Sequence, residues 1–475
     1  MSWKVGWGRA IHKNILNIAI RDIFWYLFMY LPDIFWYIKM KRLLFQELIS
    51  WKNSPDRKPL ILEGARQVGK TWLLKQLANE VYSNFIYCNF EEDPMLVSLF
   101  EGKLSANHLL EQLSFYMNKK ISAEDTLIIF DEIQAAPRAL TSLKYFNEQA
   151  NEYHIAAAGS LLGVSVGQES AFPVGKVNFL HLYPLNFIEY LQAIGEEGLA
   201  NKLVEKKDFT PLSHAIHEKL IHYFRIFLFI GGMPEVVASY SSHQDIQKVR
   251  DIQKNIQNSY ANDFSKYASP EESLKISQIW QSIPAQLAKE NKKFKFNDVK
   301  SGARYARYEL AIEWLRKAGL IYIAYATSTA KPPLDAYINS GDFKLYYLDT
   351  GLLGARLNAA PQLIVQNEML YTEYKGALIE NYCAREIKPL FEDHLHYWRS
   401  ESIAEIDFVI EDAGNIFPLE VKSGMTKHKK SLTSFQQKYH SPRAIRFSPK
   451  NFDMQGSFVN LPLYAACMIK NFLFI

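Results

Sequence analysis

The chain has 475 residues, too many for one hydrophobic core, and this length predicts about three domains. A formal net charge of +4 with 22% charged residues is ordinary for a globular protein, so a nucleic-acid-binding surface would have to be local. The cysteines lie far apart without a CxxC pair, which indicates neither a zinc knuckle nor a disulfide framework and favours a reducing, cytoplasmic compartment. They are Cys88, Cys383 and Cys467.

The first forty residues differ from the rest because they are rich in aromatic side chains. Their apolar run, 23–31, ends at Pro32 and Asp33 and is too short for a membrane span, which needs about twenty residues. They contain no small-residue cleavage site of the kind that ends a signal peptide. The near repeat DIFWYL and DIFWYI, offset by eleven residues, permits a helix lying on a membrane surface. Alternatively, these residues are an upstream segment that is not part of the working protein, and Met40 is its effective start. We expect this alternative, in which the segment makes no membrane contact.

A nucleotide site is predicted directly after Pro59. The sequence LILEGARQVGKTWLLKQLA is typical of a short apolar strand, a loop and a helix, and the loop matches GxxxxGKT. Glycines let backbone N–H groups surround phosphates, while Lys70 reaches the β- and γ-phosphate oxygens and the Thr71 hydroxyl ligates Mg²⁺. The ATP-binding residues predicted in this loop are Gly64, Ala65, Arg66, Gln67, Val68, Gly69, Lys70 and Thr71.

Two further strands are expected to bring polar groups to the same site. The apolar run 127–130 ends in Asp131 and Glu132, and the buried parallel strands of a P-loop fold deliver carboxylates at their carboxyl ends. We expect Asp131 to hold the water shell of Mg²⁺ and Glu132 to polarise the attacking water. The strand in YHIAAAGS ends at Ser160, which would lie near the γ-phosphate; a Gly-Ser pair at a strand end also serves simple chain turning.

The cation that stabilises the transferring γ-phosphoryl group has two candidates in the chain. Lys176 in FPVGKVNF and Arg225 in HYFRIFLF are both compatible with this role, and both are compatible with a solvated or snorkelling side chain. A neighbouring subunit is a third source.

The chain becomes helical and basic from about residue 262. Apolar residues recur there at helical spacing, and an aromatic, strand-like run follows at 320–326. A helix followed by a two-stranded wing would place Arg304 and Arg307 against DNA phosphates. A linker module with a solvated charged face fits the pattern equally well.

Residues 375–440 are predicted to form a mixed α/β unit with a second site. A helix carries Glu380, a strand carries Asp407, and after a turn a second strand carries Glu420 and Lys422 on one face. Converging carboxylates bind a hard divalent ion, and an adjacent lysine orients or helps to deprotonate a water. We therefore predict Glu380, Asp407 and Glu420 as ligands of a second Mg²⁺ or a Mn²⁺, and Glu420 and Lys422 as catalytic residues. The set resembles a PD-(D/E)xK phosphodiesterase site, and the sequence does not decide whether it cuts nucleic acid.

The order of these motifs resembles that of the prokaryotic AAA-type (AAA_14) ATPases with a C-terminal DUF4143 region, from about Lys41 almost to the end of the chain. The matching segments are GARQVGKTWLL, LIIFDEIQ, AAGSLLG, VNFLHLYPLNFIEYL, FIGGMPEVV, KLYYLDTGLLGARL, GALIENYCAREI, YWRSESIAEIDFVIE and PLEVKSG. The resemblance implies nucleotide binding. The family usually has Gly-Arg where this chain has Gly175 and Lys176, and because lysine lacks the bidentate fork of arginine, this difference puts a transition-state role of Lys176 in doubt.

Together these observations predict an α/β protein of several parts. The parts are an aromatic N-terminal extension at 1–40, a P-loop AAA-type ATPase domain at 41–230, a helical and winged-helix-like region at 231–335 and a DUF4143-like, restriction-endonuclease-like domain at 336–475. The predicted function is Mg-dependent ATP hydrolysis that acts on or switches at nucleic acid, with a metal-dependent nuclease site as an open question. The alternative is a signalling or scaffolding ATPase whose nuclease-like domain only binds a partner. Besides ATP, DNA and further copies of the chain are the expected partners.

Overall fold

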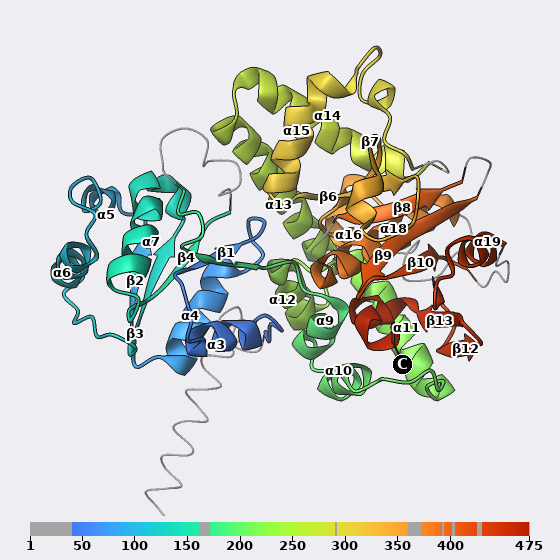
Figure 1. The fold of residues 1–475 in the computed structure, drawn as a ribbon, viewed down its shortest axis with the longest axis horizontal. Helices are drawn as coiled ribbons and strands as arrows, with labels where there is room; N and C mark the ends of the chain where they lie inside the picture. The colour runs from blue at the N-terminus through green and yellow to red at the C-terminus, as the bar shows by residue number, and fades with distance from the viewer. Residues whose placement is uncertain are drawn as a thin grey trace, which may run out of the picture.

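The computed structural model describes residues 40–160, 172–289, 292–359, 372–391, 394–400, 404–424 and 430–474. The aromatic N-terminal segment, and with it the choice between an upstream segment and a membrane-surface helix, lies outside these residues. Figure 1 shows two lobes, an N-terminal α/β lobe drawn in blue to teal and a larger lobe drawn in green to red. No helix in the described part of the chain is long and apolar enough to cross a membrane.

The N-terminal lobe is built on a five-stranded sheet in the order β2-β3-β4-β1-β5, and all its neighbouring strands are parallel. Its strands are β1 (Leu60–Glu63), β2 (Asn84–Asn89), β3 (Thr126–Asp131), β4 (His154–Ala158) and β5 (Asn178–His181). The helices of this lobe are α3 (Phe45–Asn53), α4 (Lys70–Val81), α5 (Pro94–Ser98), α6 (Ala106–Tyr116) and α7 (Pro137–Gln149). The predicted strands at the nucleotide site are confirmed, and their carboxyl ends share one edge of the sheet.

Both faces of this sheet are buried, as β3 illustrates. Leu127 and Ile129 pack into a core that extends into the second lobe, while Ile128 and Phe130 pack into a separate core with residues of α6 and α7. Successive side chains of a strand point to opposite faces, so a strand covered on both faces is apolar throughout. This burial holds the end of β3, and therefore Asp131, in a fixed position.

A series of helices follows the first sheet. They are α9 (Phe187–Ala193), α10 (Glu197–Val204), α11 (His214–Ile230), α12 (Pro234–His243), α13 (Ile246–Tyr267), α14 (Pro270–Leu287) and α15 (Tyr305–Lys317). The longest of these, α13, begins where the Asp245 carboxylate accepts hydrogen bonds from two N–H groups of its first turn. A capping box of Ser269 and Glu272 begins α14. In Figure 1, α14 and α15 lie at the top of the larger lobe, and α13 is labelled below them.

The second lobe contains an eight-stranded mixed sheet in the order β12-β13-β11-β10-β9-β8-β6-β7. Its strands are β6 (Ile321–Thr327), β7 (Ile338–Tyr347), β8 (Leu395–Arg399), β9 (Glu405–Asp412), β10 (Asn415–Val421), β11 (Ala444–Ser448), β12 (Asp453–Gln455) and β13 (Phe458–Pro462). With it pack α16 (Thr350–Arg356), α18 (Thr372–Ile387), α19 (Lys430–Tyr439) and the 3-10 helix η6 (Leu463–Phe472).

The structure divides the second half of the chain differently from the sequence-based prediction. The boundary predicted at residue 335 falls between β6 and β7, which pair antiparallel. The strand β6 also pairs in parallel with β8, so the two strands expected as a separate wing are part of the C-terminal sheet. The apolar run 320–326 indicated a strand, but the run itself contains no information about which sheet that strand joins.

A buried junction in the larger lobe joins segments far apart in sequence, including the segment that leads from β5 to α9. The carboxylate of Asp349 accepts hydrogen bonds from the N–H groups of Gly232 at 2.6 Å and Leu352 at 3.0 Å. The guanidinium of Arg385, on α18, donates to the carbonyl of Leu185 and lies 3.9 Å from the Asp349 carboxylate. A side chain at position 232 would overlap the Leu185 carbonyl oxygen, so only glycine allows this close approach.

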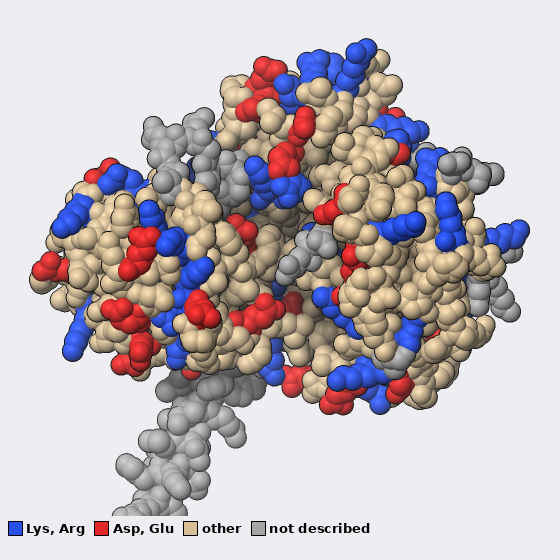
Figure 2. Space-filling model, in the orientation of Figure 1, with Lys and Arg blue, Asp and Glu red and all other residues tan. Residues whose placement is uncertain are grey.

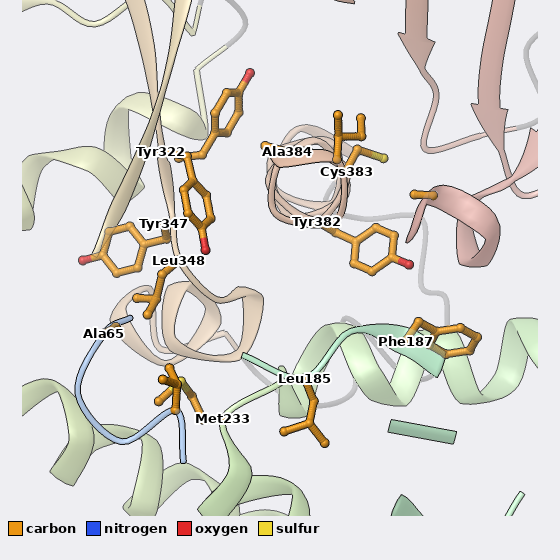
Figure 3. Packing of buried hydrophobic residues seen from close by; sticks show 14 of the residues in the cluster. Ala65, Leu185, Phe187, Met233, Tyr322, Tyr347, Leu348, Tyr382, Cys383 and Ala384 are labelled. Atoms are coloured by element: carbon orange, nitrogen blue, oxygen red, sulfur yellow. The ribbon is translucent and has the colours of Figure 1, made fainter. Parts of the chain in front are cut away.

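The phosphate-binding end of the first lobe packs against this junction. Figure 3 shows Ala65 beside Leu348 and Met233, with Tyr322 and Tyr347 nearby in the same core. The loop after β1 is therefore supported by residues of the second lobe.

Candidate functional site

The loop at residues 64–71, here called the phosphate loop, joins β1 to α4 and has an unusual backbone. Gly64, Gln67 and Gly69 have φ values of 142°, 64° and 95°. A Cβ atom at Gly64 would also overlap the carbonyl oxygen of Leu182. Helix α4 begins directly after Gly69, so the N–H groups of its first turn face the loop. The loop geometry is suited to binding phosphates through backbone N–H groups.

The ammonium of Lys70 lies at the start of the phosphate loop. Its Nζ atom donates to the carbonyl oxygens of Gly64 at 2.9 Å and Ala65 at 2.8 Å. Burial lowers the pKa of Lys70 to about 8, and the negative charges of Glu132 and Asp131 only partly oppose this shift. Phosphate oxygens would supply the stronger negative charge that the buried ammonium needs.

A hydroxyl and a carboxylate meet beside this lysine. The Thr71 hydroxyl donates to Oδ2 of Asp131 at 2.8 Å, and the hydroxyl of Tyr87, on β2, donates to the same oxygen at 2.7 Å. Oxygen ligands of this kind, with an adjacent anionic carboxylate, fit Mg²⁺. Tyr87 was not predicted from sequence; the polar residues that end β2, from Asn89 onward, were the signal that this strand also reaches the site.

Glu132 and Ser160 follow the ends of β3 and β4. Glu132 adopts a left-handed backbone with φ of 49°, and its Oε2 accepts from the side-chain amide of Gln134 at 2.5 Å. Burial raises the pKa of Glu132, an effect that the hydrogen bond from Gln134 and the charge of Lys70 oppose. Ser160 is buried at the carboxyl edge of the sheet, and the residues that follow it lie outside the described part.

The side chain of Arg66 makes a contact that the sequence did not indicate. Its Nη1 donates to Oδ1 of Asp263, on α13, at 2.5 Å, and its Nη2 lies 3.9 Å from Oε2 of Glu91. Lys266, one turn further along α13, binds Glu91 at 3.0 Å. The hydroxyl of Tyr260 also donates to the backbone carbonyl of Arg66 at 2.9 Å. Helix α13 is thus attached to the outer part of the phosphate loop.

The two cations considered from sequence lie elsewhere. Lys176 precedes β5, at the amino edge of the sheet and opposite the phosphate loop, and it pairs with Glu148 at 3.0 Å. Arg225 lies in the middle of α11, where its charge acts on Lys375. The structure does not bring either side chain to the phosphate loop of its own chain.

The second predicted site lies on the β9–β10 hairpin and α18. The hairpin is confirmed, with Ala413 and Gly414 as its two turn residues, both with positive φ. Asp407, on β9, accepts a hydrogen bond from the N–H group of Val421 at 2.7 Å. Glu420, on β10, and Lys422, directly after the strand, lie side by side with 3.0 Å between Oε1 and Nζ.

Cations from other elements neutralise the carboxylates of this site. The second oxygen of Glu420 accepts from Arg446 of β11 at 2.7 Å. Glu380, on α18, binds Lys292, Lys344 at 3.3 Å and the hydroxyl of Tyr346 at 2.6 Å. Within the described ranges, no three His, Cys, Asp or Glu side chains form a group that could hold a metal ion. Ammonium and guanidinium groups thus lie among these carboxylates, and the role of Glu380, Asp407 and Glu420 as metal ligands stays a prediction.

The basic residues of the middle region are exposed. Arg304 and Arg307 lie at the start of α15 and face solvent, as do Lys295 and Lys300 before them. Figure 2 shows Lys and Arg side chains gathered at the top of the molecule, at the α14–α15 end, with acidic side chains beside them.

Comparison with known protein families assigns most of the chain. An AAA domain model (AAA_14) matches residues 56–191, and a domain of unknown function, DUF4143, matches residues 375–465. A second domain of unknown function, DUF8612, matches residues 221–363 and crosses both boundaries predicted for the middle region. No curated protein matches the chain significantly.

Several solved structures share a distant likeness. Orc1 of Aeropyrum pernix in complex with DNA is 14% identical over 68% of this chain and 92% of its own, with a TM-score of 0.26. The RuvB Holliday junction branch migration motor of Thermotoga maritima is 14% identical over 59% of this chain and 89% of its own, with a TM-score of 0.26. AMPPCP-bound DnaA of Aquifex aeolicus is 13% identical over 58% and 88%, with a TM-score of 0.24. These scores are too low to carry a functional argument.

Proposed function

We propose that this chain, which is an AAA-type P-loop ATPase with a C-terminal DUF4143 domain, hydrolyses ATP with Mg²⁺ at the phosphate loop and uses the nucleotide to control its second lobe. The observation that carries the proposal is the convergence of an ammonium, a hydroxyl and two carboxylates from separate segments at one loop. These groups belong to Lys70, Thr71, Asp131 and Glu132.

The chemical step needs one base and one cation from these residues. Lys70 binds the β- and γ-phosphate oxygens, and Glu132 accepts the proton of the water that attacks the γ-phosphorus. The bond from the γ-phosphorus to the bridging oxygen breaks, and ADP leaves with the electron pair, so that the products are ADP and inorganic phosphate. Because burial raises the pKa of Glu132, its carboxylate is a stronger base than an exposed glutamate.

Thr71 and Asp131 would hold Mg²⁺, which neutralises charge on the β- and γ-phosphate oxygens when bound. Ser160, buried at the end of β4, is proposed as a further polar group beside the γ-phosphate.

The test is phosphate release from ATP by the full chain with Mg²⁺. Glu132→Gln is expected to keep ATP binding while turnover falls by about 10²–10⁴-fold, and Lys70→Ala is expected to lose binding as well. Lys219→Gln, which removes an exposed cation paired with Glu196 on the other lobe, is the control and should change neither. Unchanged ATP binding and turnover in Lys70→Ala would refute the assignment.

For the second lobe we propose partner binding rather than cleavage, with nucleic acid as the first candidate. Lys422 and Arg446 pair with the two carboxylate oxygens of Glu420, so a metal ion would have to displace two cations. This arrangement favours partner binding over metal-dependent cleavage. The exposed cations at the start of α15 supply a surface for phosphates.

This second proposal is tested by offering plasmid and single-stranded DNA in Mg²⁺ or Mn²⁺, with and without ATP, beside Lys422→Ala. Cleavage that disappears in Lys422→Ala would establish the metal-dependent nuclease, with its second metal ion, instead. Binding without cleavage, weakened by salt and by the double variant Arg304→Gln/Arg307→Gln, is the expected result. If neither occurs but light scattering shows ATP-dependent assembly, the chain is a scaffold that acts as a homo-oligomer.

A further inference from the structure

We propose that the side chain of Arg66 is a second cation, besides Lys70, that contacts the γ-phosphate of ATP, and that it exchanges Asp263 for this phosphate. The exchange would couple the nucleotide to α13. This inference rests on the proposed ATP hydrolysis at the phosphate loop, and it adds the group that distinguishes ATP from ADP and the helix that responds.

The position of Lys70 indicates where the terminal phosphate binds. Lysines of such loops reach the β- and γ-phosphate oxygens, and the Nζ atom of Lys70 lies at the carbonyl oxygens of Gly64 and Ala65. Arg66 is the next residue along the loop. Its side chain therefore begins at the γ-phosphate end of the site.

The electrostatic environment of Arg66 agrees with this placement. Burial alone would lower the pKa of Arg66, and the charges of Asp263 and Glu132 raise it above its ordinary value. Burial raises the pKa of Asp263, and the charge of Arg66 opposes that shift. The positive charge of Arg66 also acts on Lys70. The guanidinium thus lies within electrostatic range of both the phosphate-binding lysine and the proposed general base.

There is open space in which the guanidinium can move. The outer part of the phosphate loop and α13 enclose an open hollow of about 440 Å³. It is lined by Arg66, Gln67, Ser259, Asn262, Asp263 and Lys266. A third of the Arg66 side chain is exposed, whereas that of Asp263 is 8% exposed, so the guanidinium is the partner with freedom to move.

A γ-phosphate is the stronger competitor for this guanidinium. It carries more negative charge than one carboxylate, and its oxygens match the two-pronged donor geometry of arginine. ADP lacks this group, so Arg66 would stay with Asp263 when ADP is bound. With ATP, α13 would lose its ion pair to the loop and keep the hydrogen bond from Tyr260 to the Arg66 carbonyl.

The experiment measures binding of ATPγS and of ADP, and ATP turnover, in the full chain with Mg²⁺. Arg66→Gln should bind ADP as the unaltered chain does, bind ATPγS about tenfold more weakly and lose about a hundredfold or more in kcat. Arg66→Lys keeps the positive charge but not the two-pronged donor geometry, so its ATPγS affinity and kcat should fall less than those of Arg66→Gln. Asp263→Asn frees Arg66 and should strengthen binding of ATPγS relative to ADP.

Lys266→Gln is the matched control, because it removes another cation from the same hollow. Equal loss of ADP and ATPγS binding in Arg66→Gln, or unchanged turnover, would overturn the inference while leaving ATP hydrolysis at Lys70 in place. If only Lys266→Gln loses affinity for ATPγS and not for ADP, the role belongs to Lys266, and the inference about Arg66 is likewise overturned. Failure of the proposed function is recognised separately, by nucleotide binding that does not depend on Lys70. Circular dichroism establishes that each variant is folded.

Discussion

Lys70 is a buried cation whose cost to folding should be measurable. Because burial lowers its pKa to about 8, folding opposes protonation of this group. The cost is present in full below pH 8 and disappears as the pH rises towards 10.5, the ordinary lysine value. At neutral pH the buried ammonium of Lys70 thus lowers the stability of the chain, and the phosphates of ATP would offset this cost when bound.

Lys70→Met should therefore raise the Tm of the chain at pH 7 in the absence of nucleotide. The increase should shrink as the pH rises from 8 to 10, and ATP should no longer shift the Tm of the variant. Thermal melts across this pH range test the expectation. A Tm difference that does not change with pH would show that Lys70 keeps an ordinary pKa in the folded chain.

The C-terminal carboxylates are expected to respond to pH in opposite directions. Burial, reinforced by the charge of Glu380, raises the pKa of Asp407, so the cost of ionising Asp407 appears as the pH rises from about 4 to neutrality. Lys292 and Lys344 hold the pKa of Glu380 below its ordinary value despite burial, so its ionised form stabilises the fold above about pH 4. Asp407→Asn should raise the Tm at pH 7 but not at pH 4, and Glu380→Gln should lower it at pH 7. A Tm that rises in both variants at pH 7, or falls in both, would contradict the opposite pKa shifts of Asp407 and Glu380.

At the level of strands and helices, the sequence predicted the nucleotide site well because its residues follow local rules. GxxxxGKT fixes a loop between a strand and a helix, and an apolar run that ends in Asp131 and Glu132 indicates a buried strand. The carboxyl ends of parallel strands share one edge, so Thr71 and Asp131 could be expected to lie close together. Their hydrogen bond of 2.8 Å agrees with this reasoning.

The partners that cross between distant elements could not be predicted in this way. Asp263 meets Arg66 across nearly 200 positions of the chain. Arg446 reaches the second site from the neighbouring strand β11, and Lys344 reaches it from β7 at the far edge of the sheet. The hydrophobic pattern of α13 indicates which face is buried but not which polar residue meets the phosphate loop. The β9–β10 hairpin and the neighbouring pair of Glu420 and Lys422 follow local rules and were predicted, whereas Arg446, which reaches Glu420 from another strand, was missed.

Glycines at the buried junction of the larger lobe provide a test at this scale. A Cβ atom at Gly232 would overlap the carbonyl oxygen of Leu185, and one at Gly351 would overlap that of Ile230. Alanine at either position should lower the Tm by about 3 °C or more, because the helices and loops of the junction would have to separate. Gly376→Ala, in α18 with no atom near the added methyl group, is the control and should raise the Tm slightly. Thermal melts in which all three variants behave alike would mean that the junction is not closely packed.

Across the whole molecule, the two lobes share one hydrophobic core. The core that contains Leu127 and Ile129 of β3 also contains Leu348 and residues of α18 and η6. Buried apolar contact on this scale favours cooperative folding of the lobes.

A chain that begins at residue 182, directly after β5, should accordingly fail to fold as a compact unit. It would expose the apolar surface that now contacts the first lobe, and it should bind the dye ANS and give poorly dispersed NMR spectra. The full chain is the reference. A well-dispersed spectrum without ANS binding would show that the second lobe is an independent domain.

The most direct test of the central claim is amide hydrogen exchange of α13 in the full chain with Mg–ATPγS and with Mg–ADP. If Arg66 leaves Asp263 when the γ-phosphate binds, the amides around Asp263 should exchange faster with ATPγS than with ADP. Arg66→Gln should abolish this difference. Identical exchange with both nucleotides bound would contradict the claim that α13 responds to ATP.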